Sequence, residues 1–230
     1  TFKIITALAG LSAGIDPKRT FNCGAAYSLG SHVFKCMHAH GPVNCYDAIA
    51  RSCNVYFYNV ASIIGVQKIA DIARKLGYDA KTGIELPFEH PGSIPDPAWK
   101  QKRFKMEWYK GDTINTSIGQ GYVLVTPIQM ATMTARVATG KIIKPTLILR
   151  ENSEPLADLD IDLKHLETVR MGLRKASNEP GGTSYRHQMS HGDFIVGGKT
   201  GTAQVAGLRF HNKGKFEDHS LFTSFAPVQD

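Results

Sequence analysis

The spacing of apolar residues predicts that helices dominate the first 140 residues of the chain. Apolar side chains cover most of the circumference of residues 2–12, as they do in a buried helix. Residues 54–65 and 65–77 show helical periodicity and each stretch ends at a glycine, which predicts two consecutive helices. Residues 126–140 predict another helix, since a threonine suited to the N-cap is followed by a proline suited to the first helical position.

Strand patterns follow in the last 90 residues. Residues 144–151, 193–207 and 220–228 have the composition of strands, and the polar stretch 208–219 between the last two predicts a hairpin. Earlier in the chain, residues 82–99 contain four prolines and cannot form a long regular element. We expect that proline-rich segment to be a structured excursion at the surface or at the rim of a cleft.

These patterns predict a mixed α/β fold of the α+β type, with a mainly helical part (residues 1–140) and a strand-rich part (residues 141–230). With 230 residues, of which 42% are hydrophobic, the chain can bury a sizeable core as one domain or two packed lobes. The first ten residues begin inside an apolar helical pattern without a cap, and the last ten stop just after a strand signal. We therefore expect a segment of a longer protein, whose anchor or targeting signal would lie elsewhere.

The charge balance limits the classes of partner. Lys and Arg number 27 against 20 Asp and Glu, which gives a net charge of +7. Such a charge suits nucleic acid, a membrane surface or a substrate that carries carboxylates. The basic residues are scattered and do not alternate with aromatic residues, so nucleic-acid binding is not favoured. The sequence contains no run of 18 apolar residues, so it predicts no membrane span.

One predicted strand carries residues that a buried strand does not need. In the stretch 197–202, Gly-Gly-Lys-Thr-Gly-Thr, the glycines allow another chain to approach the backbone closely. Strand alternation places Lys199 and Gly201 on one face and Thr200 and Thr202 on the other. Such an edge can pair with an extended peptide while the lysine and the hydroxyls hold its carboxylate. The alternative is a glycine-rich bend with an exposed lysine.

Two shorter motifs precede this strand. Ser52, Cys53 and Asn54 lie between two predicted helical segments, where a loop can direct a hydroxyl and an amide into a cleft; taken alone, Asn54 also suits a helix N-cap. Lys3 belongs to the buried first helix, where desolvation would lower its pKa and allow it to act as a general base toward a hydroxyl one turn earlier. One turn before Lys3 is the position that precedes Thr1.

Together these motifs resemble the S-x-x-K, S-x-N and K-T-G signature of penicillin-binding proteins and serine β-lactamases. The blocks GDTINTSIGQGYVLVTPIQMA, TGIELPFEHPG, PGGTSYR and VGGKTGTAQ resemble the transpeptidase domain of the elongation-type class B enzymes, the penicillin-binding protein 2 group. Matching blocks extend from Thr1 to Pro227. The resemblance implies an antiparallel sheet flanked by helices, an all-helical lobe, and a single transpeptidase domain over residues 1–230 that is truncated at both ends.

The resemblance also implies an activity, a peptidoglycan D,D-transpeptidase that cross-links stem peptides through a serine acyl-enzyme and is acylated by β-lactams. The nucleophilic serine is expected immediately before Thr1, so the chain as it stands should not catalyse acyl transfer. A backbone N–H near Thr202 would serve the oxyanion hole. By position, Lys3 would activate the nucleophile, Ser52 would pass a proton to the leaving amine, Asn54 would hold the substrate amide, and Lys199, Thr200, Gly201 and Thr202 would bind the substrate carboxylate.

The cysteines raise a separate question. Cys23, Cys36 and Cys45 lie in one segment with His40, and Cys53 lies inside the Ser-Cys-Asn motif. Two disulfides, a tetrahedral zinc site and free thiols all fit these spacings. The resemblance favours zinc, because some members of the group carry a metal cluster of Asp, His and Cys in this stretch. The expected ligands are Cys23, Cys36 and His40 with Cys45 as the fourth, in a structural site that pins the segment before the Ser-Cys-Asn motif.

The resemblance further implies where the protein acts and with what. It implies stem peptides and β-lactams as ligands, a membrane glycosyltransferase and elongation-complex proteins as partners, and no cofactor for catalysis. The domain would lie in the periplasm, with an inner-membrane anchor outside these residues. Two other functions compete with the transpeptidase: a serine β-lactamase or β-lactam sensor on the same fold, and a non-catalytic, metal-stabilised scaffold of a cell-wall synthesis complex. A phosphate-binding loop is disfavoured, because GGKTGT does not match GxxxxGK[ST].

Overall fold

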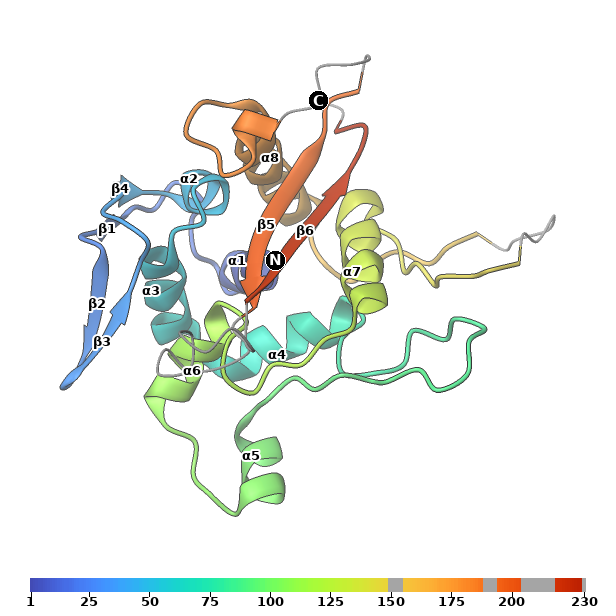
Figure 1. Ribbon diagram of the computed structural model, residues 1–230, viewed down its shortest axis with the longest axis horizontal. Coiled ribbons are helices and arrows are strands. Elements are labelled where there is room, and N and C mark those ends of the chain that lie inside the picture. The colour runs from blue at the N-terminus through green and yellow to red at the C-terminus, as the bar shows by residue number, and fades with distance from the viewer. Residues whose placement is uncertain (149–154, 188–193, 204–217, 229–230) are drawn as a thin grey trace.

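A computed structural model describes residues 1–148, 155–187, 194–203 and 218–228 (Figure 1). Its elements mix helices with short strand pairs, as the sequence predicts for the α/β class. Among the described residues, no helix is long and apolar enough to cross a membrane. The helices are α1 (Lys3–Ser12), α2 (Cys45–Ala50), α3 (Asn54–Ile64), α4 (Val66–Lys75), α5 (Pro97–Phe104), α6 (Lys110–Ser117), α7 (Pro127–Thr139), α8 (Leu163–Asn178) and the 3-10 turn η1 (Tyr185–His187).

The described strands form three antiparallel pairs. Two small pairs, β1 with β4 and β2 with β3, lie beside α3 at one edge of the molecule (Figure 1). The third pair, β5 with β6, packs against α8 and α7. The strands are β1 (Phe21–Cys23), β2 (Ala26–Leu29), β3 (His32–Lys35), β4 (Gly41–Val43), β5 (Gly197–Ala203) and β6 (His219–Phe225).

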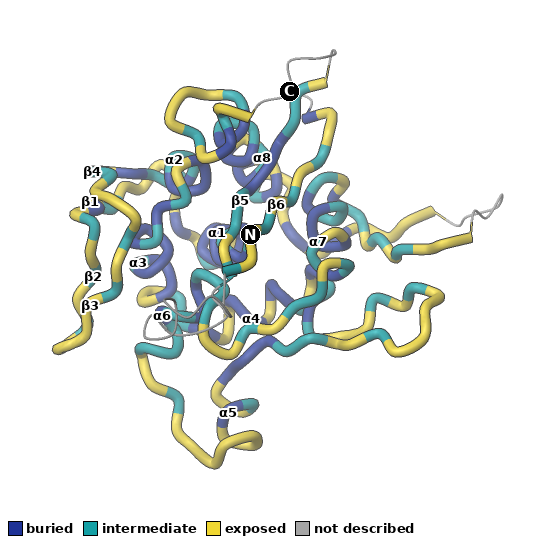
Figure 2. The backbone as a smooth tube through the Cα atoms, in the orientation of Figure 1, coloured by how far each residue is buried: buried dark blue, intermediate teal, exposed yellow. Residues whose placement is uncertain are grey.

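Helix α1 forms the centre of the hydrophobic core, as the continuous apolar pattern of residues 2–12 predicts. Ile4, Ile5 and Leu8 are at most 1% exposed, and the helix packs against α3, α4 and α8 (Figure 2). A Cβ added at Gly10 would lie 2.8 Å from a methyl group of Val60, so the glycine allows α1 and α3 to pack closely. The start of α1 is therefore held rigidly from several sides.

The other helices predicted from periodicity are also present. Helices α3 and α4 meet at Gly65, whose φ of 77° suits a residue without a side chain. At the start of α7 the Thr126 hydroxyl accepts from the Gln129 backbone N–H (3.3 Å) and the Gln129 side-chain oxygen accepts from the Thr126 N–H (2.9 Å). With Pro127 at the first helical position and Gly140 at the C-cap, α7 has the predicted start and stop signals.

The hairpin predicted for the KTG strand is confirmed. Strand β5 pairs with β6 in a register that places Gly197 opposite Phe225 and Ala203 opposite His219. Most of the predicted connecting loop, residues 208–217, lies outside the described residues, as do residues 204–207 of the longer strand that the sequence predicts.

The strand predicted over residues 144–151 is wrong where it can be judged. Residues 144–148 form no strand, and residues 149–151 lie outside the described part of the chain. A proline near the start of this stretch removes a backbone donor, and the apolar residues that suggested a strand are exposed. The segment instead bonds to Glu85, which accepts from the Thr146 hydroxyl (2.8 Å) and the Leu147 N–H (3.0 Å).

Candidate active site

Lys3 and Ser52 meet at the amino end of α1. The Lys3 ammonium nitrogen, Nζ, lies 2.8 Å from the Ser52 hydroxyl oxygen and 2.7 Å from the Ser52 carbonyl oxygen. Ser52 joins α2 to α3 in a left-handed conformation (φ 55°) that is rare for a residue with a side chain. The surrounding helices hold this costly conformation, as is common at functional sites, and it directs the serine side chain toward α1.

The environment of Lys3 shifts its protonation equilibrium toward the neutral amine. Burial, the largest effect, lowers the Lys3 pKa to about 8, although the thiols of Cys36 and Cys53 partly oppose this shift. An amine with such a pKa is unprotonated in an appreciable fraction of molecules near neutral pH. Lys3 can therefore accept a proton from a hydroxyl group beside it.

Lys199 approaches the same place from β5. Its side chain is fully buried, and its Nζ donates to the Thr200 carbonyl at 3.1 Å. Burial and then the charge of Lys3 lower the Lys199 pKa to about 7. A Cβ added at Gly201 would lie 2.7 Å from the Thr1 nitrogen, so Lys199 and Gly201 share the strand face that looks toward α1, as strand alternation predicts.

The remaining predicted site residues have other partners in this structure. The Thr200 hydroxyl donates to the Thr183 hydroxyl at 3.0 Å, on the opposite face of β5 from Lys199. Thr202 is exposed, and the Asn54 amide group donates to the Lys35 carbonyl at 3.0 Å. The structure thus places Lys3 against Ser52 and brings the Gly201 position of β5 beside Thr1 at the start of α1, while Asn54 is turned toward β3.

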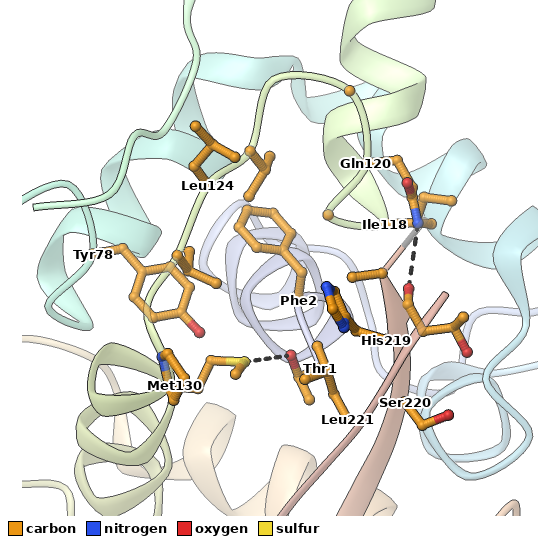
Figure 3. Close-up of a pocket in the computed structure, with 17 residues that line it drawn as sticks. Thr1, Phe2, Tyr78, Ile118, Gln120, Leu124, Met130, His219, Ser220 and Leu221 are labelled. Carbon is orange, nitrogen blue, oxygen red and sulfur yellow. Dashed lines mark hydrogen bonds between the residues drawn. The ribbon is translucent and has the colours of Figure 1, made fainter. Parts of the chain in front are cut away.

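A cleft of about 590 Å³ opens beside this group, and Thr1 and Thr202 lie in its wall (Figure 3). Phe2, Tyr78 and Met130 provide apolar lining, while Gln120 reaches across to the Thr202 carbonyl at 3.4 Å. The cleft is thus partly apolar, and it adjoins the group through Thr1 and Thr202, while Lys3 and Lys199 are buried outside its lining.

Two glycines shape the turn that forms the far side of the cleft. Gly119 and Gly121 have φ values of 78° and 75°, and both line the cleft together with Gln120. A Cβ on Gly119 would lie 2.5 Å from the Cβ of Phe2, whereas one on Gly121 would meet only the Asn115 Cβ at 3.5 Å. The turn therefore packs closely against the start of α1 at Gly119.

A cluster of cysteine and histidine side chains lies directly behind the Ser-Cys-Asn motif. One ligand atom from each of Cys23, Cys36, His40 and Cys53 lies within 4.8 Å of the others. The His40 nitrogen Nδ1 is 3.4 Å from the Cys23 sulfur and 3.6 Å from the Cys36 sulfur. The Asn54 backbone N–H donates to the Cys36 sulfur at 3.2 Å, which ties the cluster to α3.

The expected fourth ligand, Cys45, is not in this cluster. Cys45 is buried at the start of α2 and interacts with the Tyr56 hydroxyl, and burial raises its pKa to about 12. Cys53 takes the place that the sequence reading gave to Cys45. The residue type of Cys53 is its only signal in the sequence, and Cys45, which lies nearer to Cys36 along the chain, has the same type. None of the four cysteines forms a disulfide in the structure.

The donor set fits a tetrahedral zinc ion. Atoms bound to one zinc ion at about 2.0–2.3 Å lie about 3.5–3.8 Å apart in a tetrahedron, close to the separations around His40. The hydrogen bond from Cys53, followed by backbone hydrogen bonds and His40, holds the Cys36 pKa well below its usual range despite partial burial. The His40 nitrogen Nε2 is buried without a partner among the described residues. Three thiols and one imidazole are a common ligand set of structural zinc sites.

Comparison with known sequences places this geometry in a family. Residues 1–230 match the penicillin binding protein transpeptidase domain. The peptidoglycan D,D-transpeptidase MrdA of Escherichia coli K12 is 33% identical over 254 residues, which cover 100% of this chain and 40% of MrdA. MrdA of Haemophilus influenzae is 35% identical over 209 residues, which cover 83% of this chain and 32% of that protein. The chain thus spans two fifths or less of the length of these relatives.

Solved structures agree with this assignment. Penicillin-binding protein PBP2 of Helicobacter pylori, solved in complex with MreC, has a TM-score of 0.88 and 34% identity, over 98% of this chain and 42% of that one. PBP2 of Pseudomonas aeruginosa, solved in complex with WCK 5153, has a TM-score of 0.86 and 31% identity, over 99% of this chain and 52% of that one. The expected fold class is therefore confirmed. The chain belongs to the family of penicillin-binding protein transpeptidase domains, and it is similar to the MrdA and PBP2 members.

Proposed function

We propose that residues 1–230 form one domain of a peptidoglycan D,D-transpeptidase, a serine acyltransferase that β-lactams inactivate. The observation that carries this proposal is the 2.8 Å contact between the Lys3 amine and the Ser52 hydroxyl, with Lys199 on the neighbouring strand. In the full-length protein a serine would precede Thr1, one helical turn before Lys3 and beside both groups. The relatives named above bear the same activity in their names.

The proposed reaction begins with proton transfer to Lys3. The neutral Lys3 amine takes the proton of the nucleophilic serine, and the serine oxygen forms a bond to the penultimate D-alanine carbonyl carbon of a stem peptide. When the tetrahedral intermediate collapses, the C–N bond to the terminal D-alanine breaks. Ser52 donates its proton to the leaving amine and regains one from Lys3, to which it is hydrogen-bonded. An amine of a neighbouring stem then attacks the acyl-enzyme, and the same transfers run in reverse.

Strand β5 would align the donor peptide. Lys199 would pair its charge with the terminal carboxylate of the substrate, and Thr200, Gly201 and Thr202 would complete that subsite. The substrate carboxylate would raise the Lys199 pKa and so retain the proton on this lysine. A backbone N–H near Thr202 would stabilise the oxyanion. Asn54 would hold the substrate amide after exchanging its present contact with the Lys35 carbonyl.

We propose a structural role for zinc at the cluster of Cys23, Cys36, His40 and Cys53. A bound ion would cross-link the end of β1, the segment between β3 and β4, and the start of α3. Because Cys53 is the neighbour of Ser52, the same cross-link would hold the serine in its left-handed conformation. No step of acyl transfer involves the metal.

The partners and the location of the full-length protein follow from the same proposal. Its ligands would be stem peptides and β-lactams, and its partners a membrane glycosyltransferase and other proteins of an elongation complex. The Helicobacter pylori PBP2 structure contains MreC, and another similar structure is that of a peptidoglycan synthase complex. We place the domain in the periplasm with an anchor in the membrane.

The decisive test is intact-mass spectrometry of the full-length protein with and without a penicillin. We expect one covalent adduct that survives denaturation and maps to the residue before Thr1. A rapid return to the free mass would instead identify a β-lactamase. A folded, full-length protein that forms no adduct would identify the non-catalytic scaffold and overturn the proposal.

A further inference from the structure

The block PGGTSYR, to which the proposed reaction gives no role, leads from the end of α8 into η1. Gly181 has a φ of 88°, which suits a residue without a side chain. A Cβ on Gly182 would lie 2.4 Å from the Ala176 carbonyl oxygen, so glycine is needed where the chain passes the end of α8. The two glycines therefore set the course of the chain that leads to Thr183.

Ser184 anchors this segment to α8. Its backbone N–H and its hydroxyl both donate to the Ala176 carbonyl, each at 3.0 Å. Its hydroxyl is also 3.0 Å from the Ser177 hydroxyl. Ser184 is 7% exposed, so water competes little for these hydrogen bonds. Thr183, its neighbour in the chain, is exposed but is held in place through Ser184.

Thr183 connects the segments that carry Ser52 and Thr200. Its backbone N–H donates to the carbonyl of Ala50 at 3.0 Å, at the end of α2 and two residues before Ser52. Its hydroxyl accepts from the Thr200 hydroxyl of β5 at 3.0 Å. One residue thus bridges the loop of the Ser-Cys-Asn motif and the KTG strand.

The two threonine hydroxyls can together offer a proton to an anion. Each hydroxyl has one proton and two lone pairs, so the bond between Thr183 and Thr200 uses only one of their two protons. When Thr183 is the donor in that bond, Thr200 can donate its own proton to a carboxylate. Hydrogen bonds in such a chain strengthen one another, and a bond to a charged acceptor is the stronger kind. Thr183 is exposed and Thr200 is half-buried, so a ligand can reach the pair.

From this arrangement we propose that Thr183 is a positioning residue for the substrate carboxylate, because it orients the Thr200 hydroxyl and holds it at a set place relative to Ser52. The inference rests on the proposed transpeptidase function, which makes Thr200 part of the carboxylate subsite. Thr183 takes no part in bond making or breaking. Its loss should weaken the binding of ligands that carry the carboxylate and leave the acylation step unchanged. A merely structural role would affect ligands with and without a carboxylate alike.

The test measures acylation of the full-length protein by a penicillin and by the methyl ester of the same penicillin, which lacks the negative charge. The dependence of the rate on ligand concentration separates the dissociation constant from the acylation rate constant. Thr183→Val has nearly the same shape and keeps the backbone bond to Ala50, but it lacks the hydroxyl. It should weaken penicillin binding about fivefold, a typical value for one hydrogen bond, with an unchanged acylation rate constant. Both constants for the ester should stay the same, and Thr183→Ser should behave as wild type.

Thr146→Val is the matched control, because it removes an exposed threonine hydroxyl that donates to Glu85 outside the site. It should change neither constant for either ligand. Equal penicillin binding by wild type and Thr183→Val, or an equal loss for penicillin and ester, would overturn the role of Thr183 while the transpeptidase function stands. A lower acylation rate constant with unchanged binding would also overturn it and would assign the hydroxyl to the chemical step. A wild type that forms no adduct would overturn the function and this inference with it.

Discussion

At the scale of single residues, two buried lysines determine the electrostatics of the site. Burial lowers the pKa of Lys3 to about 8 and that of Lys199 to about 7, and the charge of Lys3 adds to the effect on Lys199. Two ammonium groups in one desolvated place repel each other, so they share fewer than two protons at neutral pH. The pair can thus present a base to the nucleophile and, once a carboxylate binds, a cation to the substrate.

This arrangement predicts the pH dependence of acylation. Only the neutral form of Lys3 can take the serine proton, and that form increases as the pH rises toward its pKa of about 8. At saturating penicillin, the acylation rate of the full-length protein should therefore rise about tenfold per pH unit below that pKa and level off above it. Lys3→Arg, which stays charged, should lose about a thousandfold or more at every pH. A flat profile in the wild type would contradict a base role for Lys3.

A second prediction at this scale concerns the glycine turn. Gly119→Ala should destabilise the domain by about 3 kcal/mol, because a left-handed alanine costs about 1–2 kcal/mol and its Cβ would clash with Phe2. Gly121→Ala is the matched control with nearly the same φ but an ordinary contact, and it should cost only about 1 kcal/mol. Urea unfolding measures both values. Equal losses would mean that the contact with Phe2 does not constrain the turn.

At the scale of elements, the helices whose signals are local are those that the sequence predicts well. Helix α7 has a threonine cap, a proline start and a glycine stop, and α1 has an unbroken apolar pattern; both lie within one residue of the predicted bounds. Other elements lack such signals. The small strands β1 to β4 have three or four residues each, and tertiary packing rather than alternation selects them.

The cap of α7 gives a prediction for this scale. Thr126→Ala removes the acceptor for the Gln129 N–H and half of the capping box, so it should cost about 1 kcal/mol in the free energy of unfolding. Thr139→Ala, at the exposed carboxyl end of the same helix, serves as the comparison and should cost less, because the hydroxyl contacts with the Ala135 carbonyl and the Lys141 N–H are exposed to water and alanine is the better helix former. Chemical denaturation of both variants checks the difference, and an equal effect would argue against the capping role.

At the scale of the whole molecule, the site depends on contacts between distant parts of the sequence. The family resemblance implies that Lys3, Ser52 and Lys199 lie close together; in the structure the Lys3 amine is 2.8 Å from the Ser52 hydroxyl, and the Lys3 charge acts on Lys199. The partner of each side chain could not be predicted: Asn54 bonds to the Lys35 carbonyl and Thr200 to Thr183, because local packing decides which rotamer is favoured. The choice of Cys53 over Cys45 likewise depends on tertiary packing, which places the start of α3 beside β1.

For the molecule as a whole, we predict that bound zinc stabilises the fold. The folded full-length protein should contain about one zinc per chain, and its removal by a chelator should lower the melting temperature by about 5 °C or more, since metal binding adds to folding free energy. Cys36→Ser should abolish zinc binding, whereas Cys45→Ser should retain it. Native mass spectrometry and calorimetry measure both effects. Zinc retained by Cys36→Ser would exclude the assigned ligand set.

The neighbouring places of Ser52 and Cys53 in the chain have an evolutionary consequence. A tetrahedral set loses most of its value when one ligand is lost, so lineages should keep Cys23, Cys36, His40 and Cys53 together or replace them together. Cys45 should drift independently, toward other small apolar residues that fill the space beside Tyr56. A cysteine kept in the middle of the Ser-Cys-Asn motif would then identify the lineages that still depend on a metal. Its neighbours Ser52 and Asn54 should persist in every lineage that retains acyl transfer.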